Sequence, residues 1–308
     1  MKRIMIAGGA GFIGSHLAEL LISSGNEIVV VDNLSSGLES NLSSIRDKIE
    51  FIKSDISEID YREHIDVLIN LASRASRVEW ETYPVDVALT NSLGNDHLIR
   101  TALKDKALYI YASSSEIYGN SEIIPTPETY IGKVNTIGSR SSYDEGKRFG
   151  EALVKSYERQ YGLKSIVIRF FNTFGPRMRG GDFYGRVIDR FIDQALSNGP
   201  VTVYGDGGQT RSFTYVSDTV NAIKLLLEKG TINDVYNVGN SSETRIIDLA
   251  KMVIEICSSR SEIAYLPLPE GEPRRRSADI GKIRKLGFRH QVDLRVGIKK
   301  TADYKHNM

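Results

Sequence analysis

Cysteine, histidine and an excess of charge of either sign are all scarce in this sequence. Its single cysteine, Cys257, cannot form an intramolecular disulfide, and its five histidines lack the spacing of metal ligands. Forty lysines and arginines stand against 39 aspartates and glutamates, which gives a formal net charge of +1. We therefore expect a reducing compartment, no metal and no nucleic-acid partner, because a dedicated nucleic-acid binder presents a large basic surface.

Long apolar runs are absent as well. A membrane-spanning helix needs about 18 consecutive apolar residues, and the sequence has no such run. Met1-Lys2-Arg3 leads directly into a short apolar strand, without the apolar core of a signal peptide. These features predict a cytoplasmic protein with no membrane contact. The 308 residues are 41% hydrophobic and 26% charged, which excludes wholesale disorder and fibrous structure and suggests about two globular domains.

Short β-branched runs alternate with longer stretches of helical periodicity as far as Phe170. This is the pattern of βαβ units, and it predicts an α/β fold with a Rossmann-like, doubly wound parallel sheet. The predicted strands are Arg3–Ala7, Glu27–Val31, Ile49–Lys53, Val67–Ala72, Ala107–Ala112 and Ser165–Phe170. The predicted helices are Phe12–Ser24, Pro84–Leu103 and Tyr143–Tyr161.

The alternation lapses after Phe170, where segments rich in glycine and proline begin. We therefore predict a first domain over residues 1–171, with a later return near 211–240, and a smaller C-terminal α/β lobe over 172–308. The elements predicted in this second part are helices near Val187–Ser197, Ser217–Glu228 and Ile247–Cys257, and a strand at Val235–Val238.

A glycine-rich segment, Gly8 to Gly14, follows the first predicted strand and opens the first predicted helix. It satisfies both the GxGxxG and the GxxGxxG spacing. Glycine permits a tight turn there and lets backbone N–H groups approach a pyrophosphate, which then lies at the positive end of the helix dipole. The segment predicts dinucleotide binding.

Asp32 lies at the end of the second predicted strand, directly after Val31 and 18 residues after Gly14, near the spacing at which a carboxylate meets the adenosine ribose hydroxyls. This favours NAD over NADP, because a 2′-phosphate would meet the Asp32 charge and the next residue is Asn33 rather than an arginine. Asp55 could bind adenine or could cap a helix. The predicted cofactor-binding residues are Gly8, Gly11, Phe12, Ile13, Gly14, Asp32, Asn33, Asp55, Ile56, Leu71, Tyr143 and Lys147.

Tyr143 and Lys147 are four residues apart, so they share one face of a helix. A tyrosine that acts as a base near neutral pH needs its pKa lowered from about 10 to about 7, which takes roughly 4 kcal/mol of differential stabilisation. The lysine and an oxidised nicotinamide could supply this together. The pair is therefore typical of a hydride-transfer enzyme.

Three serines, Ser113 to Ser115, and then Glu116 follow the fifth predicted strand. Parallel sheets present functional groups at the carboxyl ends of their strands, so these serines could bind substrate hydroxyls. Serines after a strand can also be simple turn residues.

These motifs resemble those of the extended short-chain dehydrogenase/reductases, the NAD-dependent epimerase/dehydratase group that acts on sugar nucleotides. Within that group the chain looks most like the UDP-glucuronate decarboxylases. The resemblance covers nearly the whole chain and is carried by residues 72–76, 114–119, 127–130, 142–148 and 171–178. The string Tyr143-Asp144-Glu145-Gly146-Lys147-Arg148 is the most telling part, because UDP-hexose 4-epimerases usually carry a serine before that lysine.

The resemblance implies decarboxylation through transient oxidation of the sugar at C4, with Tyr143, Lys147, Ser114 and Glu116 as catalytic residues. Ser114 would bind the C4 oxygen, and Glu116 would assist ring positioning and proton transfer at C5. The implied substrate-binding residues, for a UDP-sugar in the C-terminal lobe, are Ser115, Asn172, Arg211 and Arg276. A planar guanidinium such as that of Arg211 suits a phosphate. The neighbouring Arg274 and Arg275 fit a solvated turn better.

The chain departs from those decarboxylases at a few positions. Arg74 and Arg77 stand where the group has prolines, Asn70 replaces a more usual histidine, and residues 179–184 form a longer segment. The two arginines add positive charge near the expected sugar pocket.

Trp80 could stack on a ligand or could belong to the core or an interface. We expect His16 only to shape the first helix and Cys257 only to pack.

Two alternatives to decarboxylation remain open at this point. A UDP-hexose 4-epimerase would use the same NAD, tyrosine and lysine without a carboxylate contact. A non-catalytic NAD-sensing protein would need the cofactor site alone.

The resemblance also implies a homodimer, in which the helices near residues 84–103 and 143–161 pack across a two-fold axis.

Overall fold

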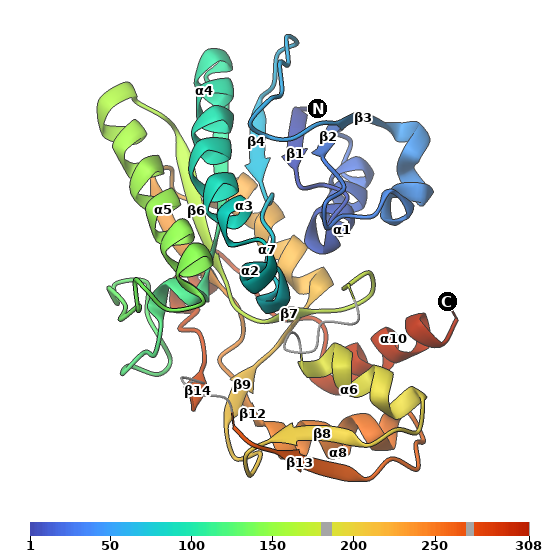
Figure 1. Ribbon diagram of the computed structural model, residues 1–308. Helices are drawn as coiled ribbons and strands as arrows, with labels where there is room; N and C mark the ends of the chain where they lie inside the picture. The colour runs from blue at the N-terminus through green and yellow to red at the C-terminus, as the bar shows by residue number, and fades with distance from the viewer. Residues whose placement is uncertain (180–186, 269–273, 308) are drawn as a thin grey trace.

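The computed structural model describes residues 1–179, 187–268 and 274–307, and it confirms the predicted α/β fold. A seven-stranded parallel sheet has the order β11-β6-β5-β4-β1-β2-β3, and Figure 1 shows the smaller lobe below it. The strands of this sheet are β1 Arg3–Ala7, β2 Glu27–Asp32, β3 Ile49–Lys53, β4 Val67–Asn70, β5 Leu108–Ser114, β6 Ser165–Phe170 and β11 Asp234–Val238.

The sheet is covered on both faces, as the nearly continuous apolar strands require. In β1, Ile4 and Ile6 belong to one apolar cluster with Leu17, whereas Met5 belongs to a second cluster with Leu98. This alternation follows from the two-residue period of a strand. The covering helices are α1 Phe12–Ser23 and α7 Val216–Lys229 on one face, and α4 Asn95–Asp105 and α5 Ser141–Tyr161 on the other.

The region predicted as one helix from Pro84 to Leu103 is divided. It consists of α3 Pro84–Leu89, a wider π turn η2 Thr90–Gly94, and α4. The Asn91 amide donates to the Val87 carbonyl oxygen, and the Ser92 hydroxyl donates to the Ala88 carbonyl oxygen. Side chains that bond to the preceding turn in this way compete with the regular helical ladder.

The remaining elements connect the sheet or build the smaller lobe. Near the sheet lie η1 Glu39–Lys48, α2 Arg77–Thr82, η3 Ser115–Tyr118, β7 Thr173–Phe174 and β10 Thr214–Tyr215. Further along the chain are α6 Val187–Leu196, β8 Val201–Tyr204, β9 Thr210–Ser212, β12 Glu243–Arg245, α8 Ile246–Ile256, β13 Ile263–Leu266, β14 Arg275–Arg276, α9 Gly281–Lys285 and α10 Leu294–His306.

Three differences from the predicted elements bear on the site. Strand β5 continues to Ser114, beyond the predicted end at Ala112, so two of the three serines belong to the strand. The strand predicted at Val235–Val238 pairs with β6 as the outermost strand of the main sheet. Short strands β9 and β14, which lack a hydrophobic run, were not predicted. Of residues 179–184, only Arg179 lies within the described residues.

The helices of the described ranges include none that combines the length and the apolar character needed to cross a membrane.

Candidate active site

The glycine-rich turn lies between the end of β1 and the start of α1, as its sequence predicts. Gly8 has φ +78°, a left-handed conformation that favours glycine. A Cβ atom on Gly14 would lie 2.3 Å from the Gly8 carbonyl oxygen, so a larger residue there would displace the backbone of the turn. The turn therefore keeps an open cradle at the N-terminus of α1, which is the place where a pyrophosphate binds.

Asp32 closes one end of this cradle. Its carboxylate accepts hydrogen bonds from the backbone N–H groups of Ala10, at 3.0 Å, and Leu34, at 2.8 Å. Burial raises the pKa of Asp32, although these two N–H groups oppose the rise. A carboxylate has lone pairs beyond the two used here, so it can still accept bonds from ribose hydroxyls.

Asp55 lies beside Asp32 across the strand ends. Its side chain accepts hydrogen bonds from the Ser57 N–H, at 2.9 Å, and from the Asn33 amide, at 2.8 Å. The segment that follows is a turn rather than a helix, so the helix-capping interpretation of Asp55 is wrong. Asp32, Asn33, Asp55, Ile56 and Leu71 line one small cavity together with Gly8 and Gly11.

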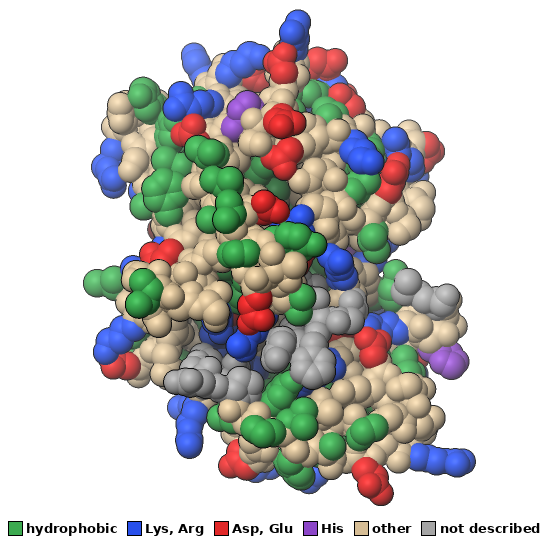
Figure 2. Space-filling model, in the orientation of Figure 1, with side chains coloured by type: hydrophobic (Ala, Val, Ile, Leu, Met, Phe, Trp, Pro, Cys, Tyr) green, Lys and Arg blue, Asp and Glu red, His purple; other side chains and the backbone are tan. Residues whose placement is uncertain are grey.

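A larger cavity of about 430 Å³ extends from the glycine turn to the smaller lobe. Figure 2 shows the molecule narrowing between its larger and smaller parts, with basic side chains visible at the narrowing. The predicted residues that line this cavity are Gly8, Gly11, Phe12, Ile13, Gly14, Leu71, Ser114, Ser115, Glu116, Tyr143, Lys147, Asn172, Arg211 and Arg276. The predicted cofactor, catalytic and substrate residues thus meet around two adjoining cavities.

Tyr143 and Lys147 project from the first turns of α5 and are both buried. The Lys147 ammonium donates to the Ala112 carbonyl oxygen at 2.8 Å and lies 5.8 Å from the centroid of the Tyr143 ring. Burial lowers the pKa of Lys147 to about 7, and the nearby carboxylate of Glu151 offsets only part of this effect. The lysine is therefore poised to change its protonation state near neutral pH.

The three serines have different partners. The Ser113 hydroxyl donates to Glu151 of α5, at 2.5 Å. The Ser114 oxygen accepts the N–H of Glu116, at 3.2 Å, and caps η3, so turn chemistry and a position in the cavity coexist in this residue. Ser115 is buried at the start of η3.

Glu116 is held by two arginines from distant parts of the chain. Arg140, next to the first turn of α5, and Arg276, in β14, both form ion pairs with its carboxylate. Arg140 also lies 3.6 Å from the carboxylate of Asp144, whose pKa burial raises to about 6 against the pull of both arginines. The four side chains form a row of alternating charge, of which Arg276, Glu116 and Arg140 line the cavity.

Arg140 was not among the residues predicted from the sequence. Its only signal in the sequence is its position three residues before Tyr143, on the same face of the helix. Trp80 stacks on the Tyr143 ring, which joins it to the core around the site. The structure therefore adds two side chains to the surroundings of the predicted catalytic pair.

The substrate-side residues come from paired strands. Arg211 of β9 and Arg276 of β14 are register partners, so both side chains lie on the same face of the small sheet. Asn172 donates its amide to the Ser212 carbonyl oxygen, at 3.0 Å. Arg274 and Arg275 are exposed, and Arg275 pairs with Glu243, so within the arginine triplet only Arg276 lines this cavity.

The two arginines that depart from the motif pair with neighbouring acids. Arg77 lines the larger cavity and bonds Glu81 at 3.1 Å, whereas Arg74 lines the smaller one and lies 3.4 Å from Glu79. Much of the positive charge that they add is therefore balanced by the acids of α2.

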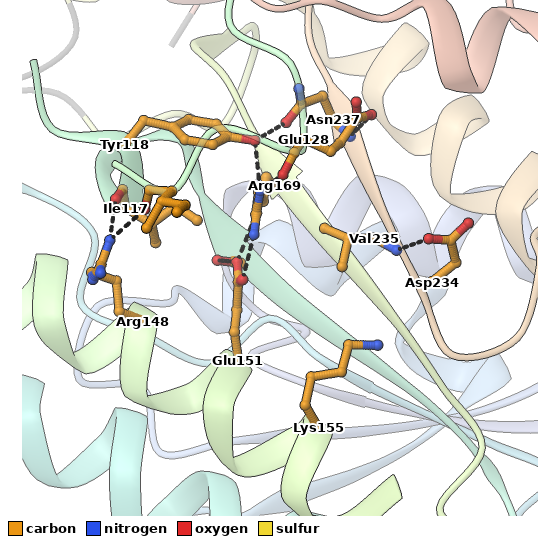
Figure 3. A network of polar contacts seen from close by, with 12 residues as sticks. Ile117, Tyr118, Glu128, Arg148, Glu151, Lys155, Arg169, Asp234, Val235 and Asn237 are labelled. Atoms are coloured by element: carbon orange, nitrogen blue, oxygen red, sulfur yellow. Dashed lines mark hydrogen bonds and ion pairs between the residues drawn. The ribbon is translucent and has the colours of Figure 1, made fainter. Parts of the chain in front are cut away.

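A largely buried polar network holds η3 and α5 against the sheet (Figure 3). Arg169 of β6 makes two bonds to Glu151, at 2.9 and 2.8 Å, and donates to the Tyr118 hydroxyl at 2.8 Å. Tyr118 in turn donates to Asn237 of β11, at 2.8 Å. Since Glu151 is one helical turn beyond Lys147, this network fixes the catalytic helix relative to the strand ends.

His16 and Cys257 have structural contacts and do not line either of the two cavities. His16 bonds the Pro176 carbonyl oxygen at 3.0 Å, so it links α1 to the segment after β7 in addition to shaping the helix. Burial raises the pKa of the half-buried Cys257 thiol, which opposes formation of a reactive thiolate.

Comparison with known proteins gives a consistent set of similarities. Residues 4–239 match the model of the NAD dependent epimerase/dehydratase family. Over 98% of the chain and 72% of the relative, the sequence is 42% identical to UDP-glucuronic acid decarboxylase 1 of Danio rerio.

Solved structures share the fold over 99% of both chains. A UDP-glucose 4-epimerase of Thermotoga maritima, solved with UDP-glucose, is 32% identical with a TM-score of 0.91. A UDP-glucose 4-epimerase of Thermus thermophilus, solved in complex with NAD, is 28% identical with a TM-score of 0.86.

The position of Asp32 predicts the effect of removing its charge. Asp32→Asn should weaken NAD binding by about tenfold and should raise the affinity for NADP relative to NAD, because the repulsion of a 2′-phosphate is lost. Calorimetric titration with both dinucleotides measures this, with Asp47→Asn at an exposed position as the control. An unchanged preference would show that Asp32 does not face the ribose.

The network around Glu151 predicts a large effect on stability. Glu151→Leu leaves the Arg169 side chain, which is only 11% exposed, without its carboxylate, and should lower the free energy of unfolding by about 3–5 kcal/mol. Asp303→Leu removes a carboxylate from an exposed ion pair and should change it by less than about 1 kcal/mol. Equal losses in urea unfolding of the two variants would contradict this account.

Proposed function

The chain belongs to the NAD-dependent epimerase/dehydratase family, and on that premise we propose that it converts UDP-glucuronate to UDP-xylose and CO₂. It is an NAD-dependent enzyme that modifies sugar nucleotides. The observation that carries the finer proposal is the Glu116 carboxylate between the guanidinium groups of Arg140 and Arg276, in the cavity that Tyr143 also lines. Arg276 there can meet a uronate carboxylate and Glu116 can serve proton transfer at C5, two tasks that hydride transfer at C4 alone does not include.

NAD fits the cradle that the glycines keep open. The backbone at Gly8, Gly11 and Gly14 would face its pyrophosphate, Asp32 would bind the adenosine ribose, and Lys147 would hold the nicotinamide ribose. When bound, NAD supplies reversible hydride acceptance at the sugar C4.

We also propose that residues 1–171, with the return near 211–240, form this cofactor domain. Residues 172–308 would mainly bind the sugar nucleotide. We propose further that the protein acts in the cytoplasm.

Proton transfer at C4 falls to Tyr143 in this proposal. Its phenolate would take the proton of the C4 hydroxyl as the carbon is oxidised, and the Ser114 hydroxyl would donate a hydrogen bond to the C4 oxygen. The Lys147 ammonium favours the phenolate by its charge, provided that the lysine is protonated. Its lowered pKa, about 7, means that this support fades as the pH rises above neutrality.

Loss of CO₂ follows from the chemistry of the 4-ketone. A carboxylate β to a ketone releases CO₂ when the bond from C5 to the carboxyl carbon breaks and its electron pair moves into the enolate. Arg276 would bind the leaving carboxylate, and Glu116 would mediate protonation of C5. Tyr143 then returns its proton to the C4 oxygen as the ketone is reduced.

The second candidate is 4-epimerisation of a UDP-hexose. The two solved epimerases share the fold along nearly their whole length, and the cavity holds the same tyrosine and lysine pair that this reaction needs. Epimerisation leaves the ion-paired Glu116 without a role, which is why we rank it second. A non-catalytic NAD sensor ranks third.

Product analysis separates these candidates. Purified protein is given UDP-glucuronate or UDP-glucose with added NAD, and the products are followed by proton NMR. We expect UDP-xylose from the first and no UDP-galactose from the second. UDP-galactose alone would establish the epimerase, and no conversion of either substrate would overturn both catalytic proposals for UDP-sugars.

The same assay measures the effects of three substitutions. Tyr143→Phe should lower kcat by about 10²–10⁴-fold, because the phenol oxygen is lost. Glu116→Gln and Arg276→Ala should each lower turnover of the uronate by at least about tenfold. Arg274→Ala, at an exposed position in the same segment, serves as the matched control. Uronate turnover that Glu116→Gln and Arg276→Ala leave intact would refute the decarboxylase proposal.

We propose further that the enzyme is a homodimer. Val85, Leu89, Leu93 and Phe149 are exposed apolar residues on α3, η2 and α5, which pack against one another. An interface there would cover them. Light scattering should give a dimer mass for the wild type and a monomer for Phe149→Glu, with Tyr265→Glu in the smaller lobe as control. A monomeric wild type would contradict the proposal.

A further inference from the structure

Trp80 is the single tryptophan of the chain, and it lies face to face with Tyr143. The ring centroids are 4.4 Å apart and the ring planes differ by 16°. Trp80 is 7% exposed and Tyr143 is 6% exposed. Together with the buried Val87 of α3, they form an apolar cluster separate from the two large clusters of the sheet.

The indole is held in place by contacts of its own. Its N–H donates to the Arg74 carbonyl oxygen at 3.0 Å, and the Arg140 guanidinium lies 5.4 Å from the ring. Helix α2, which carries Trp80, begins at a Ser76 cap whose hydroxyl oxygen accepts the Glu79 N–H. Trp80 is therefore fixed in the molecule independently of Tyr143.

The direction of the Tyr143 hydroxyl depends on the orientation of its ring. Rotation about the Cα–Cβ bond decides where the phenol oxygen lies, and rotation about the Cβ–Cγ bond decides the ring plane, which the O–H bond prefers. A flat neighbour at stacking distance restricts that rotation, and a displacement of about 1 Å in a reacting group can cost roughly 10²-fold in rate.

We propose that Trp80 is a positioning residue for Tyr143: its indole face sets the plane of the phenol and keeps water from that side, so that proton transfer at C4 depends on it. This inference rests on the proposed catalytic role of Tyr143, but it holds for decarboxylation and epimerisation alike. A residue that served only to fill space would be replaceable by any apolar side chain of similar volume.

Steady-state kinetics test the positioning role. Trp80→Leu keeps an apolar side chain, closer in size to that of Trp80→Phe than to the indole, but removes the flat face, and should lower kcat by about 10- to 100-fold with KM changed by less than about threefold. Trp80→Phe restores a flat ring and should recover most of the rate. Val87→Ala loosens the same cluster without touching the stack, and is the control for packing.

Equal kcat losses in Trp80→Leu and Val87→Ala, or no recovery in Trp80→Phe, would overturn the proposal. A loss confined to KM would overturn it too, because that result would make Trp80 a substrate-binding platform.

Fluorescence tests the contact without any need for catalysis. Trp80 is the only indole, so emission excited at the red edge of absorption reports on its surroundings alone, and a tyrosinate in contact quenches it. As the pH rises, wild-type emission should fall in a step that Tyr143→Phe lacks. Matching titration curves in the two proteins would show that the rings are not stacked.

The two arms separate this inference from the proposed function. The kinetic arm uses whichever sugar nucleotide the wild type converts. If it converts none, the catalytic proposal fails and takes the positioning role of Trp80 with it, while the fluorescence step still decides the stacking.

Discussion

Burial of the Lys147 ammonium is the constraint on which the site depends. An ammonium that leaves water loses hydration, so its pKa falls to about 7, and the Ala112 carbonyl oxygen and the Glu151 carboxylate offset only part of that cost. The burial requires α5 to lie close to the sheet. Gly150 permits this, because a Cβ atom there would lie 2.0 Å from the Tyr111 hydroxyl oxygen. The network from Glu151 to Arg169 then holds the helix at that distance.

The polar side chains that line the cavity come from two parts of the fold. The sheet and α5 supply the serines, Tyr143 and Lys147, whereas Arg211 and Arg276 come from the short paired strands beyond them. The ion pair of Arg276 with Glu116 connects these two groups of side chains. The row of alternating charge therefore forms only when β14 lies against the segment that follows β5. This arrangement suits an anionic sugar nucleotide, because guanidinium groups lie on the substrate side and the titratable pair lies on the cofactor side.

Local patterns predicted the parallel sheet well, because a buried strand and an amphipathic helix each impose a period on the sequence. Strands β1, β3 and β6 have the predicted bounds, and the glycine turn followed from its place between a strand and a helix. Short strands such as β9 and β14 have no period to detect and form only through pairing with distant segments. The contacts of Arg140 with Glu116, and of Trp80 with Tyr143, also join residues far apart in sequence, so spacing gave no signal for them.

The central physical claim is that one lysine of this protein is desolvated beside the catalytic tyrosine. The most direct measurement is an NMR titration of the protein with isotopically labelled lysine side chains, compared with Lys147→Met to assign the resonance. The account predicts a single lysine that titrates near pH 7 and is missing from the variant. If every lysine titrates at its ordinary value, above about 10, the buried ammonium does not exist and the proposed support for the Tyr143 phenolate fails with it.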